Sequence, residues 1–336
     1  MDVETNKIKS MDQKIRVSIL MPIYKVEQYL EKTLDSIFTQ TYPEISFVFV
    51  NDFSPDYSLQ VLKNTIKKHN IDNSRYTIVN HEQNEGIAVS RADAIAHAKG
   101  DYIFFVDSDD WIENDAVEQM VSATKAGTID IVGCDFKKDY QSGKTTCHHE
   151  EYAETCKENM LRCLNYDIGT VLWKLLIRRN LFDNFTITPH VDIVEDYIIS
   201  VKLYYYAKSF VAIPQAFYHY VQYNQARVSF QTQRSIKMHI KGVQEVEQFC
   251  CEREIFDKVV AHKLLLRKFN IKSNYVLNKE LLDISAYLNT FPEASGMWRE
   301  LPYTKKERIK FWLVEHKMSF VIHLMNVKFF FHRNVN

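Results

Sequence analysis

The fold of this chain is decided by the stretch Phe104-Phe105-Val106-Asp107-Ser108-Asp109-Asp110-Trp111. The apolar run at residues 102–106 shows no polar alternation, which is typical of a strand buried on both faces. Asp107 and Asp109 follow it two residues apart, so an extended chain points both carboxylates to the same side. Because like charges this close repel each other, a divalent cation with oxygen ligands would offset the cost. A solvated loop after a strand, where Asp and Ser are common, fits these residues equally well.

The composition describes a globular chain. The 336 residues are enough for about two domains, and 46% of them are hydrophobic, so a sizeable core can form. The 42 basic and 43 acidic side chains leave a net charge of -1, which gives no case for a nucleic-acid partner. The 8 glycines form neither G-x-G-x-x-G nor G-x-x-x-x-G-K-[ST], so dinucleotide and P-loop phosphate sites are disfavoured.

The 6 cysteines form no C-x-x-C pair. Cys147-His148-His149 resembles half of a zinc site, but the other cysteines supply no matching second half. The first residues are polar rather than signal-like, and no run approaches the ~20 apolar residues that span a bilayer. We therefore expect a cytoplasmic chain with reduced thiols.

Strands and helices are expected to alternate through the first part of the chain. Apolar runs predict strands over residues 17–23, 45–50, 76–79, 102–106 and 129–136, and helical periodicity predicts helices over residues 27–39, 59–66, 87–98 and 114–126. This alternation is typical of an α/β fold with a wound, mostly parallel sheet and helices on both faces. Ligands bind beyond the carboxyl ends of such strands. Tyr24, Asp52 and the carboxylates at 107–109 all lie there, and their convergence favours a ligand site over a solvated loop.

Two later segments carry further candidates. Residues 171–177 contain Trp173 and Lys174, and a helix expected over residues 192–206 begins near Glu195-Asp196. Carboxylates in the first turn of a helix are favoured by the helix dipole, so this pair fits simple capping as well as a functional role.

The chain is expected to divide into three parts. A loose polar tail, residues 1–13, precedes an α/β domain over residues 14–225. That domain includes a polar hairpin or excursion over residues 137–157 and two short strands on either side of Pro214. The alternation then stops, and residues 226–336 predict a smaller helical region.

The last stretch, from Leu301, combines basic and aromatic side chains. Its residues are Lys305, Lys306, Arg308, Lys310, Lys317, Lys328 and Arg333, with Phe311, Trp312, Phe320, Phe329, Phe330 and Phe331. Three interpretations fit: a terminal helix packed on the body, a helix on an anionic membrane surface, and a partner interface.

An ordered set of motifs resembles those of the family 2 glycosyltransferases, which have the GT-A fold. The motifs are Val17-Ser18-Ile19-Leu20-Met21-Pro22-Ile23-Tyr24, Ser36-Ile37-Phe38-Thr39-Gln40-Thr41-Tyr42, Asn51-Asp52-Phe53-Ser54-Pro55-Asp56, Asn84-Glu85-Gly86 with Arg91, Gly100-Asp101-Tyr102-Ile103 leading to Asp107-Ser108-Asp109, Trp173-Lys174-Leu175, and Glu195-Asp196. Together they cover roughly residues 15–230. A single D-x-D is weak evidence, whereas the ordered set at matching spacing is specific.

The resemblance implies an inverting transferase that moves a sugar from a nucleotide diphosphate sugar, most simply a UDP-sugar, to a glycan or lipid-linked acceptor in surface polysaccharide synthesis. It implies that Asp52 binds the nucleotide base, Asp107 the ribose, and Asp109 a Mg2+ or Mn2+ ion on the diphosphate. Asp196 would be the general base, and Arg91 would place a positive charge near the nucleotide.

Further site residues follow from the same resemblance. Three are donor-binding candidates: Pro22, Tyr24 and Ser108. Four are weaker candidates for the sugar or acceptor pocket, and packing explains several of them equally well: Trp111, Lys174, Glu195 and His219.

Five positions depart from the family pattern. Asn51 replaces the first Asp of the D-D-G-S turn, Phe53 replaces its Gly, and Lys25 stands where Asn is usual. Ala92 ends the segment that resembles A-R-N, and Val221 stands where an Arg is expected. These departures bear on how donor and acceptor are held, and they leave the carboxylates in place.

Two other functions fit part of the pattern. A sugar-nucleotide nucleotidyltransferase shares the wound core, but its Gly-rich basic N-terminal loop is missing here. A non-catalytic nucleotide-sugar-binding or scaffold protein would account for Asn51 and Phe53. Release of pyrophosphate from UTP plus a sugar phosphate would identify the first, and binding without turnover the second.

Overall fold

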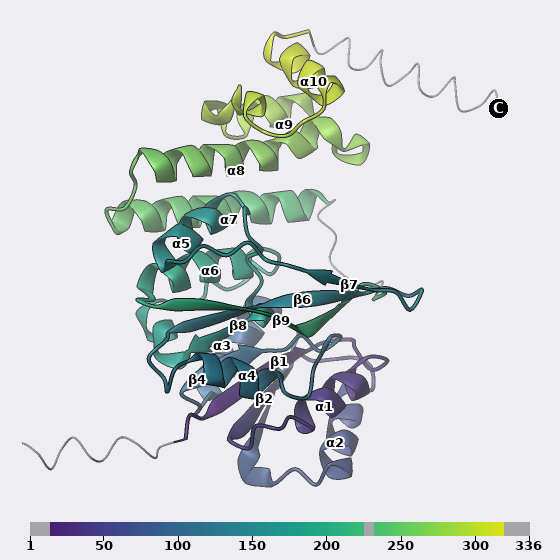
Figure 1. Ribbon diagram of the computed structural model, residues 1–336. Coiled ribbons are helices and arrows are strands. Elements are labelled where there is room, and N and C mark those ends of the chain that lie inside the picture. The colour runs from purple at the N-terminus through teal and green to yellow at the C-terminus, as the bar shows by residue number, and fades with distance from the viewer. Residues whose placement is uncertain (1–13, 225–231, 319–336) are drawn as a thin grey trace, which may run out of the picture. The chain divides into compact units, whose positions relative to one another are not determined.

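The computed structural model describes residues 14–224 and 232–318 (Figure 1). The chain divides into two compact units, residues 1–160 with 168–227 and residues 161–167 with 228–336. The tail expected over residues 1–13 lies outside the described residues. The domain boundary at residue 225 stays a prediction, and nothing in the sequence pattern indicates that residues 161–167 belong with the second unit.

The first unit is an α/β arrangement, as expected, and its described residues form a nine-stranded sheet. The strands are β1 Val17–Ile23, β2 Ile45–Asn51, β3 Tyr76–Asn80, β4 Tyr102–Phe105, β5 Trp111–Ile112, β6 Ile131–Asp139, β7 Thr145–His148, β8 Leu175–Arg178 and β9 Phe210–Val221. The helices are α1 Leu30–Phe38, α2 Ser58–Lys68, α3 Ile87–His97, α4 Ala116–Ala123 and α6 Glu195–Tyr206, and α5, Cys156–Leu164, spans the change of unit along the chain.

The sheet has the order β3-β2-β1-β4-β8-β6-β9-β5, with β7 paired to β6. Strands β3, β2, β1 and β4 are parallel, so their carboxyl ends share one edge. Beyond them the sheet is mixed, because β8 runs antiparallel to both β4 and β6, and β5 runs antiparallel to β9. The parallel part therefore holds the edge at which the sequence places Asp52 and Asp107.

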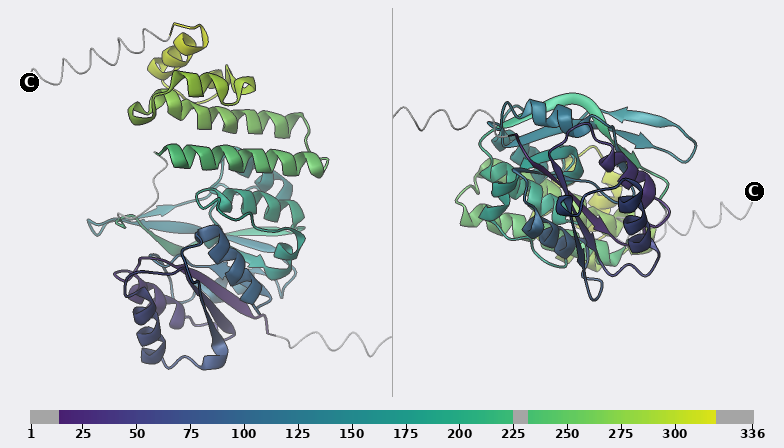
Figure 2. Two further views of the ribbon diagram at one scale, coloured as in Figure 1. Left: turned by 180° about the vertical axis from the view of Figure 1, so that it is seen from behind. Right: turned by 90° about the horizontal axis from the view of Figure 1, so that it is seen from below.

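Both faces of the parallel strands are covered (Figures 1 and 2). Ile19 and Phe47 are buried in a cluster with apolar residues of α1 and α2. Phe38 of α1 packs edge-on against Phe47, with ring centroids 5.0 Å apart. Leu20 and Val48, one position further along each strand, are also buried and point to the face that α3 covers. Burial on both faces explains why the strands are predominantly apolar, and the hydroxyls of Ser18 and Ser46, which interrupt the runs, lie 2.9 Å from each other.

Strand β9 replaces the two short strands expected around Pro214. Its register against β6 passes from Cys134 opposite Ile213 to Asp135 opposite Ala216. Pro214 lies in the bulge that results, where its missing N–H does not interrupt the ladder. The hairpin expected over residues 137–157 is confirmed as β6 and β7.

The second unit is helical within its described residues. Its helices are α7 Gln233–Glu252, α8 Lys258–Leu277, α9 Ile284–Asn289 and α10 Lys305–Glu315. The side chains of Thr232, Asp257 and Thr304 accept backbone N–H bonds at the starts of α7, α8 and α10. No helix among the described residues is long and apolar enough to cross a membrane. The aromatic residues from Phe320 onward lie outside the described part.

Candidate active site

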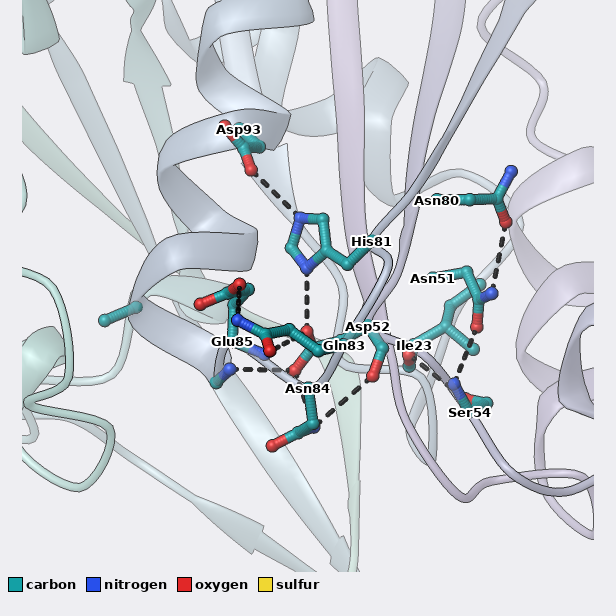
Figure 3. Close-up of polar contacts among 12 residues, drawn as sticks. Ile23, Asn51, Asp52, Ser54, Asn80, His81, Gln83, Asn84, Glu85 and Asp93 are labelled. Carbon is teal, nitrogen blue, oxygen red and sulfur yellow. Dashed lines mark hydrogen bonds and ion pairs between the residues drawn. The ribbon is translucent and has the colours of Figure 1, made fainter.

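Asp52 follows β2 at the carboxyl edge of the sheet, and its buried carboxylate has four polar partners (Figure 3). Its Oδ1 lies 2.7 Å from His81 Nδ1 and accepts the backbone N–H of Glu85 at 2.8 Å. Its Oδ2 accepts Asn84 Nδ2 at 2.8 Å and the backbone N–H of Gly86 at 2.9 Å. Because a carboxylate offers about four acceptor positions, these partners saturate Asp52, which therefore fastens the loop that begins α3.

His81, directly after β3, bridges Asp52 and α3 (Figure 3). Its Nδ1 faces Asp52, and its Nε2 lies 2.9 Å from Oδ2 of Asp93 on α3. Burial of the ring opposes protonation, but hydrogen bonds and charge from Asp52 and Asp93 outweigh it and raise the pKa of His81. The bridge therefore favours a charged ring.

A second carboxylate reaches the start of α3 from the loop before α6. Asp192 Oδ1 accepts the backbone N–H of Ala88 at 3.3 Å, where the positive end of the helix dipole favours a negative charge. Gly86 has a φ of 91°, and a Cβ there would lie 2.4 Å from Asp192 Oδ1. The glycine of the N-x-G motif is therefore required by this close approach.

Arg91 extends from α3 to three carboxylates and is only 3% exposed. Its Nη2 donates to Asp107 Oδ1 at 3.2 Å, and its Nη1 lies 3.3 Å from Glu195 Oε1. Nη1 also forms an ion pair with Asp196 Oδ1. Arg91 thus joins the carboxylate that follows β4 to the two that begin α6, so the motifs meet through one guanidinium.

The two carboxyl groups at the start of α6 differ in their surroundings. Burial raises the pKa of Glu195 to about 7, although the charge of Arg91 opposes the rise. The side chain of Asp196 is 19% exposed, so it can meet a substrate that Glu195 cannot reach.

Asp110 anchors the turn that carries Asp107 and Asp109. It is 1% exposed, and it accepts the Tyr218 hydroxyl at 2.9 Å and the Val221 N–H at 2.8 Å. The Tyr218 hydroxyl oxygen in turn accepts the backbone N–H of Asp107 at 3.0 Å. Strand β9 therefore fixes the turn through Asp110, while Asp107 and Asp109 remain partly exposed.

Asp109 lies beside an open cavity. Its Oδ2 accepts Asn224 Nδ2 at 2.8 Å, and Asn224 also lines a cavity of ≈ 490 Å³. Apart from Val26, the other residues that line the cavity are polar, charged or aromatic. They are Lys25, Glu27, Gln28, Tyr29, Asp56, Gln141 and Tyr223. The chain thus offers a solvent-reached space next to the second carboxylate of the turn.

The same turn is the place where a divalent cation would be held. Within the part of the chain that the structure describes, no cluster of three or more His, Cys, Asp or Glu side chains could hold a metal ion. Asp107 and Asp109 still supply hard oxygen atoms at a partly exposed rim. Mg2+ commonly takes one or two carboxylates and completes its shell with phosphates and water, so these residues fit a cation that arrives with a diphosphate.

The residues after β1 also lie at this rim. Tyr24 is 40% exposed, and Lys25 Nζ lies 5.1 Å from the centre of its ring. Lys25 has a φ of 54°, in the left-handed region that Asn adopts more easily than Lys. Pro22 is buried inside β1 opposite Val50 of β2 and lies beyond the residues that pair with β4.

Two departures from the family turn have visible consequences. Phe53 has a φ of 56° and is 56% exposed. A left-handed conformation costs a residue other than Gly roughly 1–2 kcal/mol, so Phe53 stores strain at the rim. Asn51 accepts the Ser54 N–H at 3.2 Å and donates to Asn80 Oδ1 at 3.1 Å, which closes the turn without a second carboxylate.

Trp111 and His219 pack against each other in β5 and β9. Their ring centroids are 3.4 Å apart, and Trp111 Nε1 donates to Asp139 Oδ2 at 2.9 Å. His219 lies between Asp139 Oδ2, at 3.0 Å from its Nδ1, and Glu113 Oε1, at 2.9 Å from its Nε2. These contacts give both residues a packing role.

Lys174 is buried at 1% exposure and pairs with Glu150. Its Nζ lies 5.1 Å from the centre of the Tyr152 ring. These contacts also fit a packing role.

The sequence did not mark several residues that hold the site together. His81, Asp93 and Asp192 belong to no motif, because their partners are far along the chain. Only Gly86 gave an indication in the sequence. A glycine in a motif can mark a place where another part of the chain comes close to the backbone, and here that part is Asp192.

A family model described as Glycosyl transferase family 2 matches residues 18–187. The protein EpsH of Bacillus subtilis is 31% identical over 212 residues, which cover 61% of this chain and 60% of EpsH. The poly(ribitol-phosphate) beta-glucosyltransferase of Bacillus spizizenii is 27% identical over 220 residues, which cover 62% of this chain and 32% of that enzyme. The chain thus spans less than two thirds of the length of either relative.

A solved structure shares the fold. S. aureus TarS 1-349 in complex with UDP superposes with a TM-score of 0.62 at 18% identity. The match covers 90% of this chain and 88% of TarS 1-349.

Proposed function

This chain belongs to glycosyl transferase family 2, and from that premise we propose that it transfers a sugar from a nucleotide diphosphate sugar to a hydroxyl group. The donor in this proposal is a UDP-sugar, and the acceptor is a glycan or a lipid-linked sugar. The observation that carries the proposal is Arg91, which holds the carboxylate after β4 and the carboxylates of α6 together.

The donor lies at the carboxyl edge in this proposal. Asp107 binds the ribose, and Tyr24 packs along the nucleotide, with Pro22 and Ser108 shaping the pocket. Arg91 adds positive charge near the nucleotide. A base contact by Asp52 stays a prediction, and it requires one of the four present partners of Asp52 to yield.

A divalent cation, Mg2+ or Mn2+, would be held by Asp109, with Asp107 beside it. Such a cation offsets the negative charge that develops on a departing diphosphate. Asn224 orients the Asp109 carboxylate through the 2.8 Å bond to Oδ2. The chain contributes few ligands, so cation and donor are expected to bind together.

The reacting base is Asp196. The acceptor hydroxyl oxygen attacks the anomeric carbon, the bond from that carbon to the diphosphate oxygen breaks, and the hydroxyl proton passes to an Asp196 carboxylate oxygen. Attack opposite to the leaving group inverts the anomeric centre. The ion pair with the guanidinium of Arg91 holds the Asp196 side chain in place.

The relatives support the class of donor and acceptor. The TarS structure holds UDP, and the Bacillus spizizenii enzyme is named for glucosyl transfer to poly(ribitol-phosphate). A role in the synthesis of a surface polysaccharide or a related polymer is consistent with these names.

The same proposal includes contact of the chain with the inner face of an anionic membrane. Helix α10 exposes Ile309 by 54% and Trp312 by 41%, beside exposed Lys305 and Lys306. Glu315 of α10 is turned to Tyr287 and Trp298, which leaves Glu307, in the first turn, as the acidic residue of the helix that lies near these lysines. Co-sedimentation with vesicles that contain anionic lipid tests the contact, and equal recovery with neutral vesicles would contradict it.

The function is tested with a panel of nucleotide sugars. We expect one UDP-sugar, with Mn2+ present, to raise the melting temperature of the protein and to be hydrolysed slowly to UDP even without an acceptor.

Asp109→Asn should lower the metal-dependent affinity for UDP about 100-fold, as measured by titration calorimetry with and without Mn2+. If the unaltered chain and Asp109→Asn bound UDP with the same affinity, and Mn2+ did not change that affinity, the role of Asp109 would be contradicted. Pyrophosphate formation from UTP and a sugar phosphate would instead identify a nucleotidyltransferase.

A further inference from the structure

The ring of His81 lies between two carboxylates that come from different elements (Figure 3). Its Nδ1 is 2.7 Å from Asp52 Oδ1, and its Nε2 is 2.9 Å from Asp93 Oδ2. A neutral imidazole has one N–H donor and one acceptor, whereas a carboxylate oxygen can only accept. Both contacts are therefore hydrogen bonds only when both ring nitrogens carry a proton.

The bridge has two ends of different character. The Asp52 side chain is 5% exposed and is also bonded to the loop that begins α3. The Asp93 side chain is 42% exposed and lies on α3, two residues beyond Arg91. His81 thus joins the end of β2 to the helix that presents the guanidinium to Asp107 and Asp196.

The start of α3 depends on such links from outside the helix. Gly86 precedes the helix with no side chain to cap it, and the structure shows no side-chain cap bond there. Asp52 accepts the N–H groups of Glu85 and Gly86, and Asp192 accepts that of Ala88. The helix is therefore positioned by neighbouring carboxylates, one of which is held by His81.

We propose that His81 is a positioning residue that, as an imidazolium, ties Asp52 to Asp93 and so keeps α3 and its Arg91 aligned with the carboxylates at the ends of the site. This inference rests on the proposed transfer reaction, because it assigns a task to that same site. Neither His81 nor Asp93 touches the substrate in this arrangement.

The bridge makes the site sensitive to alkaline pH. The charged groups that act on the ring are Asp52, from the end of β2, and Asp93, from α3, and both raise the pKa of His81 against the effect of burial. The ring is therefore fully protonated at low pH, and it loses its charge as the pH rises through that raised pKa. The link to Asp93 should fail first, because water can replace it at the more exposed end.

The first experiment measures the bridge itself. NMR titration of the histidine rings in the full chain, with His81 assigned by loss of its signal in His81→Gln, should show protons on both nitrogens at neutral pH and a pKa above 6.5. Asp93→Asn should lower that pKa. Glu82→Gln is the matched control, since it removes an exposed carboxylate next to His81 in the chain. A His81 pKa at or below 6.5 in the unaltered chain would overturn the proposal.

The second experiment measures positioning. Hydrogen exchange of the amides at 84–91 should quicken about 10-fold in Asp93→Asn, the change expected from loss of one charged hydrogen bond, and should stay unchanged in Asp93→Glu. kcat/KM for the donor should fall at a lower pH in Asp93→Asn than in the unaltered chain. Unchanged exchange together with an unchanged pH profile would refute the positioning role. If the unaltered chain turned over no nucleotide sugar, the proposed function would fail. The NMR titration and the hydrogen exchange would still show whether His81 links Asp52 to Asp93, because neither measurement depends on activity.

Discussion

Replacement of Arg91 by methionine probes the contact on which the candidate site is built. Arg91 is 3% exposed and faces Asp107, Glu195 and Asp196, whose side chains are 29%, 7% and 19% exposed. Methionine keeps much of the side-chain volume and removes the charge. Three carboxylates would then face one another without the cation that now lies between them.

The expected loss of stability follows from that burial. Removing one partner of a buried ion pair costs about 3–5 kcal/mol, because the remaining charges stay desolvated. For a unit of 150–250 residues, each kcal/mol lowers the melting temperature by about 2–4 °C, so we expect a fall of about 10 °C. The loss should be smaller at pH 5 than at pH 8. The pKa of Glu195 is raised from 4.5 to about 7 in the folded chain, so this carboxyl is neutral at pH 5 and charged at pH 8.

Calorimetric melts at pH 5 and pH 8 measure this effect, with the transition of the first unit identified by hydrogen exchange of β1 and β4. Arg16→Met is the matched control. Its ion pair with Asp101 spans 3.5 Å between side chains that are 54% and 41% exposed, so it should cost less than about 1 kcal/mol. Melting of Arg91→Met within about 2 °C of the unaltered chain at both pH values would refute the reasoning.

Substitutions at two further positions test the surroundings of the site. Glu195→Gln should stabilise the fold at pH 8 by up to about 3 kcal/mol and have little effect at pH 5. The reason is that burial raises the folded-state pKa of Glu195 to about 7 from 4.5, so stability is lost as pH rises between these values. An equal effect at both pH values in thermal melts would contradict this. Phe53→Gly should be about 0.5–1 kcal/mol more stable than Phe53→Ala, because φ is 56° and the side chain is 56% exposed. Equal melting temperatures for the two variants would show that Phe53 stores no strain.

The edge that holds the site could be predicted because its signals are local. The predominantly apolar sequences of β1, β2 and β4 indicate strands buried on both faces, and parallel strands place their carboxyl ends together. Asp107 and Asp109 became candidates because carboxylates after such a strand carry an electrostatic cost, and their role as ligands stays a prediction. The sequence did not indicate where pairing changes direction, since the two-residue strand β5 and the antiparallel strand β8 have no distinctive pattern.

The partners of the site residues could not be predicted, because they depend on tertiary contact. Asp52 looks like a ligand-binding carboxylate in sequence, yet the structure surrounds it with donors from residues 81–86. The link from Arg91 to Asp196 joins residues whose separation in the chain gives no pattern. Lys174 carries a family motif, but its contact with Glu150 could be found only from the fold.

The proposed reaction depends most on Asp196, which takes the proton of the acceptor hydroxyl while the donor nucleotide is bound at the same site. Asp196→Asn keeps the size of the side chain and removes the proton acceptor. Its UDP affinity, measured by titration calorimetry, should stay within about 2-fold of the unaltered chain, because binding and proton transfer are separate contributions. Its rate of sugar transfer should fall about 10²–10⁴-fold. An unchanged rate of transfer, with UDP bound as tightly as before, would show that Asp196 is not the general base.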